Sequence, residues 1–128
     1  MTPAPRDPAA PNPRRALGQR GEDLVARWYE TGGYEILDRN WRRREGELDL
    51  ILARGRTVVF CEVKTRSSNR FGAPIEAISR GKSQRIRRLA ALWLSESQLR
   101  GRELRFDVAS VMVERGTAPV VEIIEGAF

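Results

Sequence analysis

The segment GELDLILARGRTVVFCEVK, from Gly46 to Lys64, decides the fold of this chain. Two apolar runs, residues 48–53 and 57–64, flank a short polar turn that contains Gly55. A turn centred on a Gly-X pair joins such runs into a β-hairpin. A two-residue type II′ loop would place Leu50 opposite Cys61 and fix the register of the whole hairpin.

The same register gathers charged residues at the open end of the hairpin. Asp49 then faces Glu62, and Glu47 faces Lys64. Alternation puts these four on one face and an apolar set on the other, namely Leu48, Leu50, Leu52, Val59, Cys61 and Val63. We therefore expect three carboxylates and one ammonium group to share one face of the sheet.

The composition limits the kinds of site that the chain can build. Its 128 residues favour one domain with its own core. With one cysteine, Cys61, and no histidine, neither a disulfide nor a Cys/His zinc site is available. We expect Cys61 to be a small buried apolar residue. Carboxylates remain as metal ligands, and they select hard cations such as Mg²⁺ or Mn²⁺.

The charge balance favours a polyanionic partner. The chain carries 23 Lys and Arg against 17 Asp and Glu, a net charge of +6. Nucleic acid is the first expectation for such a surface, and an acidic membrane the second, while ordinary solubility explains the charge about equally well. No apolar run approaches the length of a transmembrane helix. We expect a cytoplasmic protein without a membrane association.

The order of the predicted elements indicates an α/β domain. Residues 1–13 hold five of the seven prolines and are expected to form a disordered tail, so that residues 14–128 make up the domain. Apolar residues at helical spacing predict a helix over 15–31, ended by Gly32 and Gly33, and a strand follows over 34–41. Trp28 is expected in the core.

After the hairpin and a polar loop over 67–74, a second helix is expected from the N-cap Ser79 to residue 97. Trp93 lies on its apolar face. Strands over 104–113 and 120–124 complete the order α-β-β-β-α-β-β. A crossover helix implies parallel pairing, so we predict a mixed sheet of about five strands flanked by helices.

The carboxylate face supports a chemical hypothesis. Asp49 and Glu62 could share one Mg²⁺, with the Val63 carbonyl as an additional ligand. Lys64 could orient a metal-bound water or neutralise charge on a phosphate. Alternatively, these residues are ordinary exposed charges, with Glu47 and Lys64 as a cross-strand ion pair. Only two of the 23 basic residues are lysines, which gives position 64 some weight.

The motifs of the chain resemble a known family. Asp49 followed by Glu62-Val63-Lys64 is similar to the D-x(n)-E-x-K core of the PD-(D/E)xK nuclease superfamily, and Glu22 is similar to the helix-borne acid of Holliday-junction resolvases. The segments GEDLVARWYE, GGYEILDRNWR, GELDLI, VVFCEVKTR and RFGAPIEAI resemble the YraN family of bacterial proteins. The resemblance covers about residues 17–124.

The resemblance implies a restriction-endonuclease-like core and a Mg²⁺- or Mn²⁺-dependent endonuclease. It implies Glu22, Asp49 and Glu62 as metal ligands and Lys64 as the catalytic lysine. DNA, in branched or single-stranded form, is favoured over RNA as the substrate. Leu48 stands where the superfamily has proline, so the local strand geometry stays open. A homodimer would suit an enzyme that cuts two strands, although no residue requires one.

Two basic segments are candidates for contact with nucleic acid. Arg42, Arg43 and Arg44 could hold phosphates while Trp41 stacks on a base, or Trp41 could pack in the core beside a solvated turn. The second helix presents a basic face formed by Lys82, Arg85 and Arg88. An ordinary exposed helix face is the alternative there.

Three classes of function therefore compete. The first is the metal-dependent nuclease, and the second is a nucleic-acid-binding module that keeps the fold without turnover. The third is an assembly factor whose basic surface meets an acidic protein.

Overall fold

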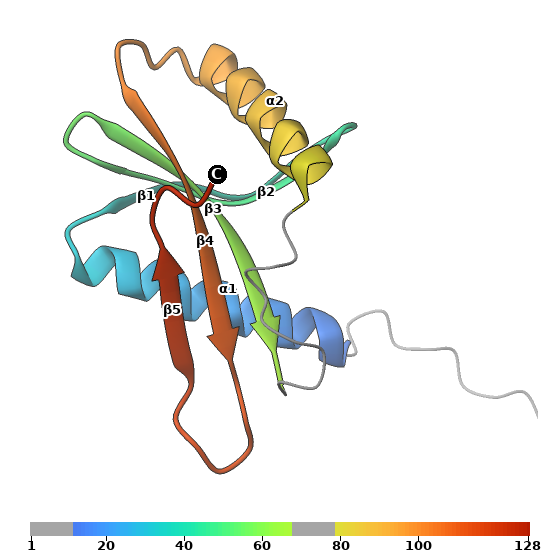
Figure 1. The fold of residues 1–128 in the computed structure, drawn as a ribbon. Helices are drawn as coiled ribbons and strands as arrows, with labels where there is room; N and C mark the ends of the chain where they lie inside the picture. Colours follow the sequence, from blue (N-terminus) through green and yellow to red (C-terminus); the bar gives the residue numbers. More distant parts are fainter. Residues whose placement is uncertain (1–11, 68–78) are drawn as a thin grey trace, which may run out of the picture.

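The computed structural model describes residues 12–67 and 79–128. Its elements are α1 (Pro13–Thr31), β1 (Glu35–Arg43), β2 (Gly46–Arg54), β3 (Thr57–Arg66), α2 (Arg80–Ser97), β4 (Glu103–Met112) and β5 (Val120–Ile124) (Figure 1). This order confirms the predicted α/β arrangement. Most of the predicted loop and the segment RFGAPIEAI lie outside the described residues.

The strands form one mixed sheet in the order β1-β2-β3-β4-β5. β3 and β4 are parallel and are connected through α2, whereas the other neighbours are antiparallel. Leu50 pairs with Cys61 and Arg54 with Thr57, as predicted. Of the two loop residues only Gly55 has a positive φ, 59°, as a type II′ turn requires.

The sheet is covered by helices on both faces, so the core has two halves. α1 packs on one face with Leu50, Leu52, Val59 and Cys61, and α2 packs on the other with Ile51, Val58 and Phe60. β2 and β3 consequently contain nearly continuous apolar runs, because both sides of these strands are buried. The predicted polar face is therefore confined to the open end of the hairpin.

Leu48 does not lie where the sequence predicted. It packs with Trp41 on the α2 side, whereas Leu50 packs on the α1 side. Strict alternation would put both on one face. Asn40 on the neighbouring strand has φ 51°, and neither Asn40 nor Asp49 belongs to a paired position of the β1–β2 ladder. This irregularity interrupts the alternation of β2, so the side chains of Leu48 and Leu50 point to opposite faces of the sheet.

A buried hydrogen-bond network fixes the C-terminal half of α1 to the sheet. Asp107 of β4 is fully buried, and its Oδ2 accepts from the Tyr29 hydroxyl at 2.7 Å. The Arg105 guanidinium donates to both carboxylate oxygens at 2.9 Å, and the Gly126 amide donates to Oδ1 at 3.0 Å. Burying a carboxylate is tolerated here because every side of it is paired.

The N-terminal half of α1 lies very close to β3. A Cβ at Gly21 would be 1.8 Å from Thr65 Oγ1, a separation that no side chain permits. Thr65 Oγ1 is itself buried and has no hydrogen-bond partner among the described residues. Glycine at position 21 therefore allows the approach that brings the next residue, Glu22, to the open end of the hairpin.

Two expectations about α1 need correction. The helix begins at Pro13, which the sequence placed in the tail, because Asn12 caps it by accepting from the amides of Arg14 and Arg15. Residues 1–11 of that tail lie outside the described part. Trp28, expected in the core, is 42% exposed, whereas Trp93 is buried as predicted.

Among the described residues, no helix combines the length and apolarity needed to cross a bilayer.

Candidate functional site

Asp49 lies at the centre of the candidate site, where β2 and β3 separate. The paired ladder of these strands ends at Leu50 and Cys61. Beyond it, Asp49 Oδ2 accepts a hydrogen bond from the backbone amide of Val63 at 2.9 Å. The carboxylate thus fills the space where direct strand pairing has stopped.

Two further carboxylates approach Asp49 from the side of α1. One oxygen from each of Glu22, Glu47 and Asp49 lies within 4.8 Å of the others. These three residues line a pocket of about 470 Å³, together with Asn40 and Arg42. Glu47 forms an ion pair with Arg42 at 3.4 Å, instead of the predicted cross-strand pair with Lys64. The pair with Lys64 was wrong because β2 and β3 diverge before reaching that position.

Glu62 and Lys64 project from β3 toward α2. The Glu62 carboxylate forms an ion pair with Lys82 of α2, with Nζ 3.0 Å from Oε1. Lys82 is also within hydrogen-bonding reach of Lys64. The only two lysines of the chain therefore meet beside Glu62. Lys82, predicted as part of an outward basic face, belongs instead to the site.

The electrostatics of the site reflect crowded acids in a partly buried place. Burial is the largest cause that raises the pKa of Asp49, and the charges of Glu62 and Glu22 raise it as well. The hydrogen bond from the Val63 amide opposes them, and the resulting pKa is about 7. Burial also raises the pKa of Glu22, although a hydrogen bond with Asn40 opposes this. A bound cation would remove the repulsion that these carboxylates exert on one another.

The neighbouring ammonium groups are perturbed in opposite directions. Burial lowers the pKa of Lys64, and the hydrogen bond and like charge of Lys82 lower it further. Burial alone would lower the pKa of Lys82. The hydrogen bond with Lys64 and the charge of Glu62 outweigh burial and raise this pKa. Lys82 is thus the counter-ion of Glu62, and Lys64 is the ammonium group that loses its proton more easily.

The arrangement brings together most of the predicted site. Asp49 interacts electrostatically with Glu22, Glu47 and Glu62, and it therefore links the carboxylates on the α1 side to those on the α2 side. Carboxylate oxygens in this number are suited to a hard divalent cation. Val63, predicted to contribute its carbonyl, is held beside Asp49 through its amide.

The predicted nucleic-acid contacts divide into buried and exposed residues. Trp41 is 9% exposed and packs in the α2-side core. Arg43 covers its ring at 4.3 Å and pairs with Glu96 at 2.9 Å. The geometry therefore favours the packed alternative for Trp41. Arg44, Arg85 and Arg88 are exposed, and none of them forms an ion pair with another described residue.

Comparison with known proteins gives a clear relationship. The model of the uncharacterised protein family UPF0102 matches residues 21–111. The chain belongs to this family, which is the YraN family. A UPF0102 protein of Rhodococcus opacus is 50% identical over 113 residues, covering 88% of this chain and 96% of the relative. One from Frankia casuarinae is 56% identical over 115 residues, with the same two coverages. A third, from Nocardia farcinica, is 49% identical over 115 residues, covering 90% of this chain and 91% of the relative.

The UPF0102 match spans every residue of the candidate site. It includes Glu22 on α1, the hairpin, and Lys82 on α2. The names of these relatives give family membership without an activity. The fold and the family agree with the resemblance found in the sequence.

Sequence reasoning missed three features of this UPF0102 site. Glu47 was placed among the charges but not among candidate ligands, because the register predicted Lys64 as its partner. Lys82 is 20 residues from Glu62, and no local pattern joins them. Asn40 has a positive φ where β2 becomes irregular. Its position before Trp41 in a predicted strand gave no signal of that conformation. The rarity of lysine in this chain was the one clue to Lys82.

Proposed function

We propose that the chain is a Mg²⁺- or Mn²⁺-dependent nuclease that hydrolyses phosphodiester bonds of nucleic acid. The observation that carries the proposal is the environment of Asp49. Its carboxyl group, with a pKa of about 7, is partly buried among further carboxylates near a lysine whose pKa is lowered. Such a concentration of opposed shifts in one place is characteristic of catalytic sites. The restriction-endonuclease-like order of the elements supports the same function.

The residues have distinct roles in this proposal. Asp49, Glu22 and Glu62 would hold the metal, with the Val63 carbonyl as a further ligand. The cation supplies charge that polarises the phosphate and lowers the pKa of a bound water. Lys64 is the catalytic lysine that orients the attacking water or stabilises negative charge on the phosphate.

Glu47 and Lys82 extend the set of residues beyond the sequence motif. Glu47 lies with Glu22 and Asp49 and can complete the carboxylate shell. Lys82 neutralises Glu62 in the metal-free protein. If Glu62 bound a cation, the Lys82 ammonium group would be available to contact a phosphate oxygen. Glu47 would thus add to the negative charge that attracts a cation, and Lys82 to the positive charge that attracts a phosphodiester.

The exposed basic residues would hold the nucleic acid backbone. Arg85 and Arg88 on α2 and Arg44 in the turn after β1 form no ion pair with a described acid. We propose DNA, in branched or single-stranded form, as the preferred substrate. A homodimer would allow two strands to be cut together.

Cleavage of labelled DNA tests the proposal. Duplex, single-stranded and four-way-junction DNA are each incubated with the full chain in Mg²⁺, in Mn²⁺ and in EDTA. We expect cleavage only with metal, and a loss of about 100-fold or more in Glu62→Gln and in Lys64→Met. Glu96→Gln is the matched control, since Glu96 is a surface acid paired with Arg43. Cleavage that persists in both site variants would refute the assignment of the site.

A second candidate function is a nucleic-acid-binding module without turnover. Two of the carboxylates already form ion pairs within the chain, Glu47 with Arg42 and Glu62 with Lys82. These ion pairs favour the second function because they balance the two negative charges without a metal. In that case binding would fall steeply with salt and would not depend on metal or on Lys64. Failure to retard any of the three DNA forms at low salt would instead favour the assembly-factor alternative.

A further inference from the structure

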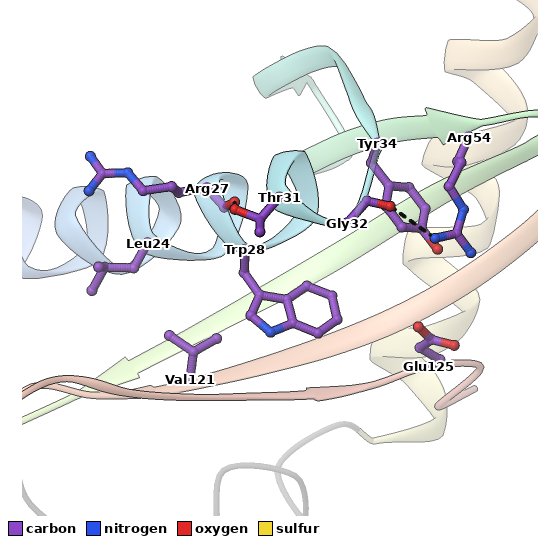
Figure 2. A pocket seen from close by; sticks show the side chains of 9 residues that line it. All are labelled: Leu24, Arg27, Trp28, Thr31, Gly32, Tyr34, Arg54, Val121 and Glu125. Atoms are coloured by element: carbon purple, nitrogen blue, oxygen red, sulfur yellow. Dashed lines mark hydrogen bonds between the residues drawn. The ribbon is translucent and has the colours of Figure 1, made fainter.

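A second pocket lies at the C-terminal end of α1, away from the carboxylates. Its volume is about 480 Å³. The walls come from α1, from the Gly32 turn that follows it, from the hairpin end of β2 and from β5 (Figure 2). Trp28 extends from α1 into this pocket toward Val121, and Tyr34 and Arg54 form its other side.

Trp28 is the exposed aromatic residue of this pocket. Its side chain is 42% accessible, whereas Trp41 and Trp93 are 9% and 6% accessible. Tyr29 contacts it in a T-shaped arrangement with ring centroids 5.1 Å apart. One such contact covers at most one of the two faces of an indole. A flat apolar surface is thus open to solvent at a fixed position on a helix.

The charges around Trp28 favour an anionic ligand. Arg27 on α1 lines the pocket and forms no ion pair with another described residue. Arg54 is held in place, because it donates to the Gly32 carbonyl at 3.0 Å and lies 4.3 Å over the Tyr34 ring. The acid that lines the pocket, Glu125, is 3.6 Å from Arg105 and is therefore partly neutralised.

We propose that this pocket binds one unpaired nucleotide of a single-stranded nucleic acid. The base stacks on Trp28, and its phosphates contact Arg27 and Arg54. Aromatic stacking next to cationic side chains is how proteins hold single strands irrespective of sequence. Trp28 thus provides the stacking surface that the buried Trp41 does not.

The inference rests on the proposed function only in taking nucleic acid as the partner. Arg54 is five residues from Asp49 along β2, which corresponds to about 17 Å of extended strand. About five stacked nucleotides cover that length. The pocket would therefore hold a single strand at a second point. This point lies at the turn end of the hairpin, whereas the candidate metal ligands lie at its open end.

The test measures binding without catalysis. The full chain is titrated in EDTA with an oligothymidylate, with a strand of the same length that lacks bases, and with a duplex. Quenching of the intrinsic tryptophan fluorescence by a stacked base reports on Trp28, because the other two indoles are buried and a base cannot stack on them. We expect oligothymidylate to quench the emission. With affinity measured by the anisotropy of a dye-labelled strand, Trp28→Ala should weaken oligothymidylate binding by about tenfold or more while leaving the base-free strand and the duplex unchanged.

Three further variants make the test specific. Trp28→Phe should retain part of the affinity because a phenyl ring also stacks. Leu92→Ala is the matched control, since Leu92 is a comparably exposed apolar side chain on α2, and it should change nothing. Arg27→Ala should reduce the dependence of oligothymidylate binding on salt, by about 0.7 in the logarithmic slope. This last variant keeps the inference testable if Trp28→Ala does not fold.

Several outcomes would overturn the inference. They are an absence of quenching, an unchanged affinity in Trp28→Ala, or an equal loss for the base-free strand and the duplex. A dimer that dissociates in Trp28→Ala, with unchanged oligothymidylate affinity, would assign the pocket to a second copy of the chain. Trp28-dependent binding without any cleavage in Mg²⁺ would refute the nuclease proposal and leave this inference standing.

Discussion

Replacing Asp49 with asparagine should stabilise the metal-free protein at alkaline pH. Asparagine has nearly the same shape and can still accept the 2.9 Å hydrogen bond from the Val63 amide. It removes the negative charge that burial and the charges of Glu62 and Glu22 disfavour. The variant therefore isolates the electrostatic cost of crowding these carboxylates.

The sign and size of the effect follow from the pKa of Asp49. Folding raises this pKa from 3.8 to about 7, so the native state binds the proton more tightly than the unfolded chain does. The resulting stabilisation is complete below about pH 4 and is lost as the pH rises through about 7. A difference of this size corresponds to about 4 kcal/mol, of which relaxation of the site would leave about 2–4 kcal/mol.

The assay is unfolding in EDTA between pH 5 and pH 8.5, by heat and by urea. At pH 8.5 we expect Asp49→Asn to exceed the wild type by about 2–4 kcal/mol, or roughly 10 °C in melting temperature. The difference between the two proteins should shrink toward pH 5, where Asp49 is protonated in the native state, and should vanish only below about pH 4. Added Mn²⁺ should stabilise the wild type at pH 8.5 and stabilise the variant much less.

Asp23→Asn is the control, because Asp23 is an exposed acid on the same helix as Glu22 and pairs with Arg39. It should leave the pH dependence near pH 7 in place. The reasoning would be refuted if Asp49→Asn were no more stable than the wild type at pH 8.5. Parallel pH profiles for the two proteins across the whole range would refute it equally.

Two further predictions concern the supports of the site. Gly21→Ala should destabilise the fold by about 2–3 kcal/mol in urea unfolding, because the new methyl group would meet Thr65 Oγ1 at 1.8 Å. Gly18→Ala, with nothing within 4 Å, should be neutral or stabilising by about 0.5–1 kcal/mol, and a similar cost at both positions would contradict the close packing. Lys82→Met should lower the Mn²⁺ concentration needed for thermal stabilisation, because it removes a positive charge 3.0 Å from Glu62; a higher requirement would show that Lys82 assists metal binding.

The hairpin could be predicted from the sequence because its determinants are local. Gly55 permits the positive φ that the turn needs, and the turn then sets the pairing of Leu50 with Cys61. The burial of Cys61 followed from its place within an apolar run. The order of the elements followed similarly, since periodicity and capping residues such as Ser79 act within a few residues of themselves.

The faces of the open end could not be predicted, because they depend on where the strand ladder stops. Alternation holds only while a strand stays paired and regular, and it fails at Asp49, opposite the positive φ of Asn40. Leu48 therefore turns to α2, and Glu47 finds Arg42 in place of Lys64. An irregularity at one residue therefore changed the ion-pair partner of Glu47 from the one that the register predicted.

Contacts between distant segments were likewise decided by the tertiary structure alone. Trp28 and Trp41 both looked like candidates for the core, yet the packing of α2 buries Trp41 and leaves Trp28 open beside β5. Lys82 reaches Glu62 because the first turn of the crossover helix α2 lies beside that residue of β3. The sequence by itself pointed to Asp49, Glu62 and Lys64 as candidate site residues, because they lie within one hairpin. Only the packing of two helices on opposite faces of the sheet decided which cations and carboxylates meet them, since such contacts depend on the position of whole elements and on no local pattern.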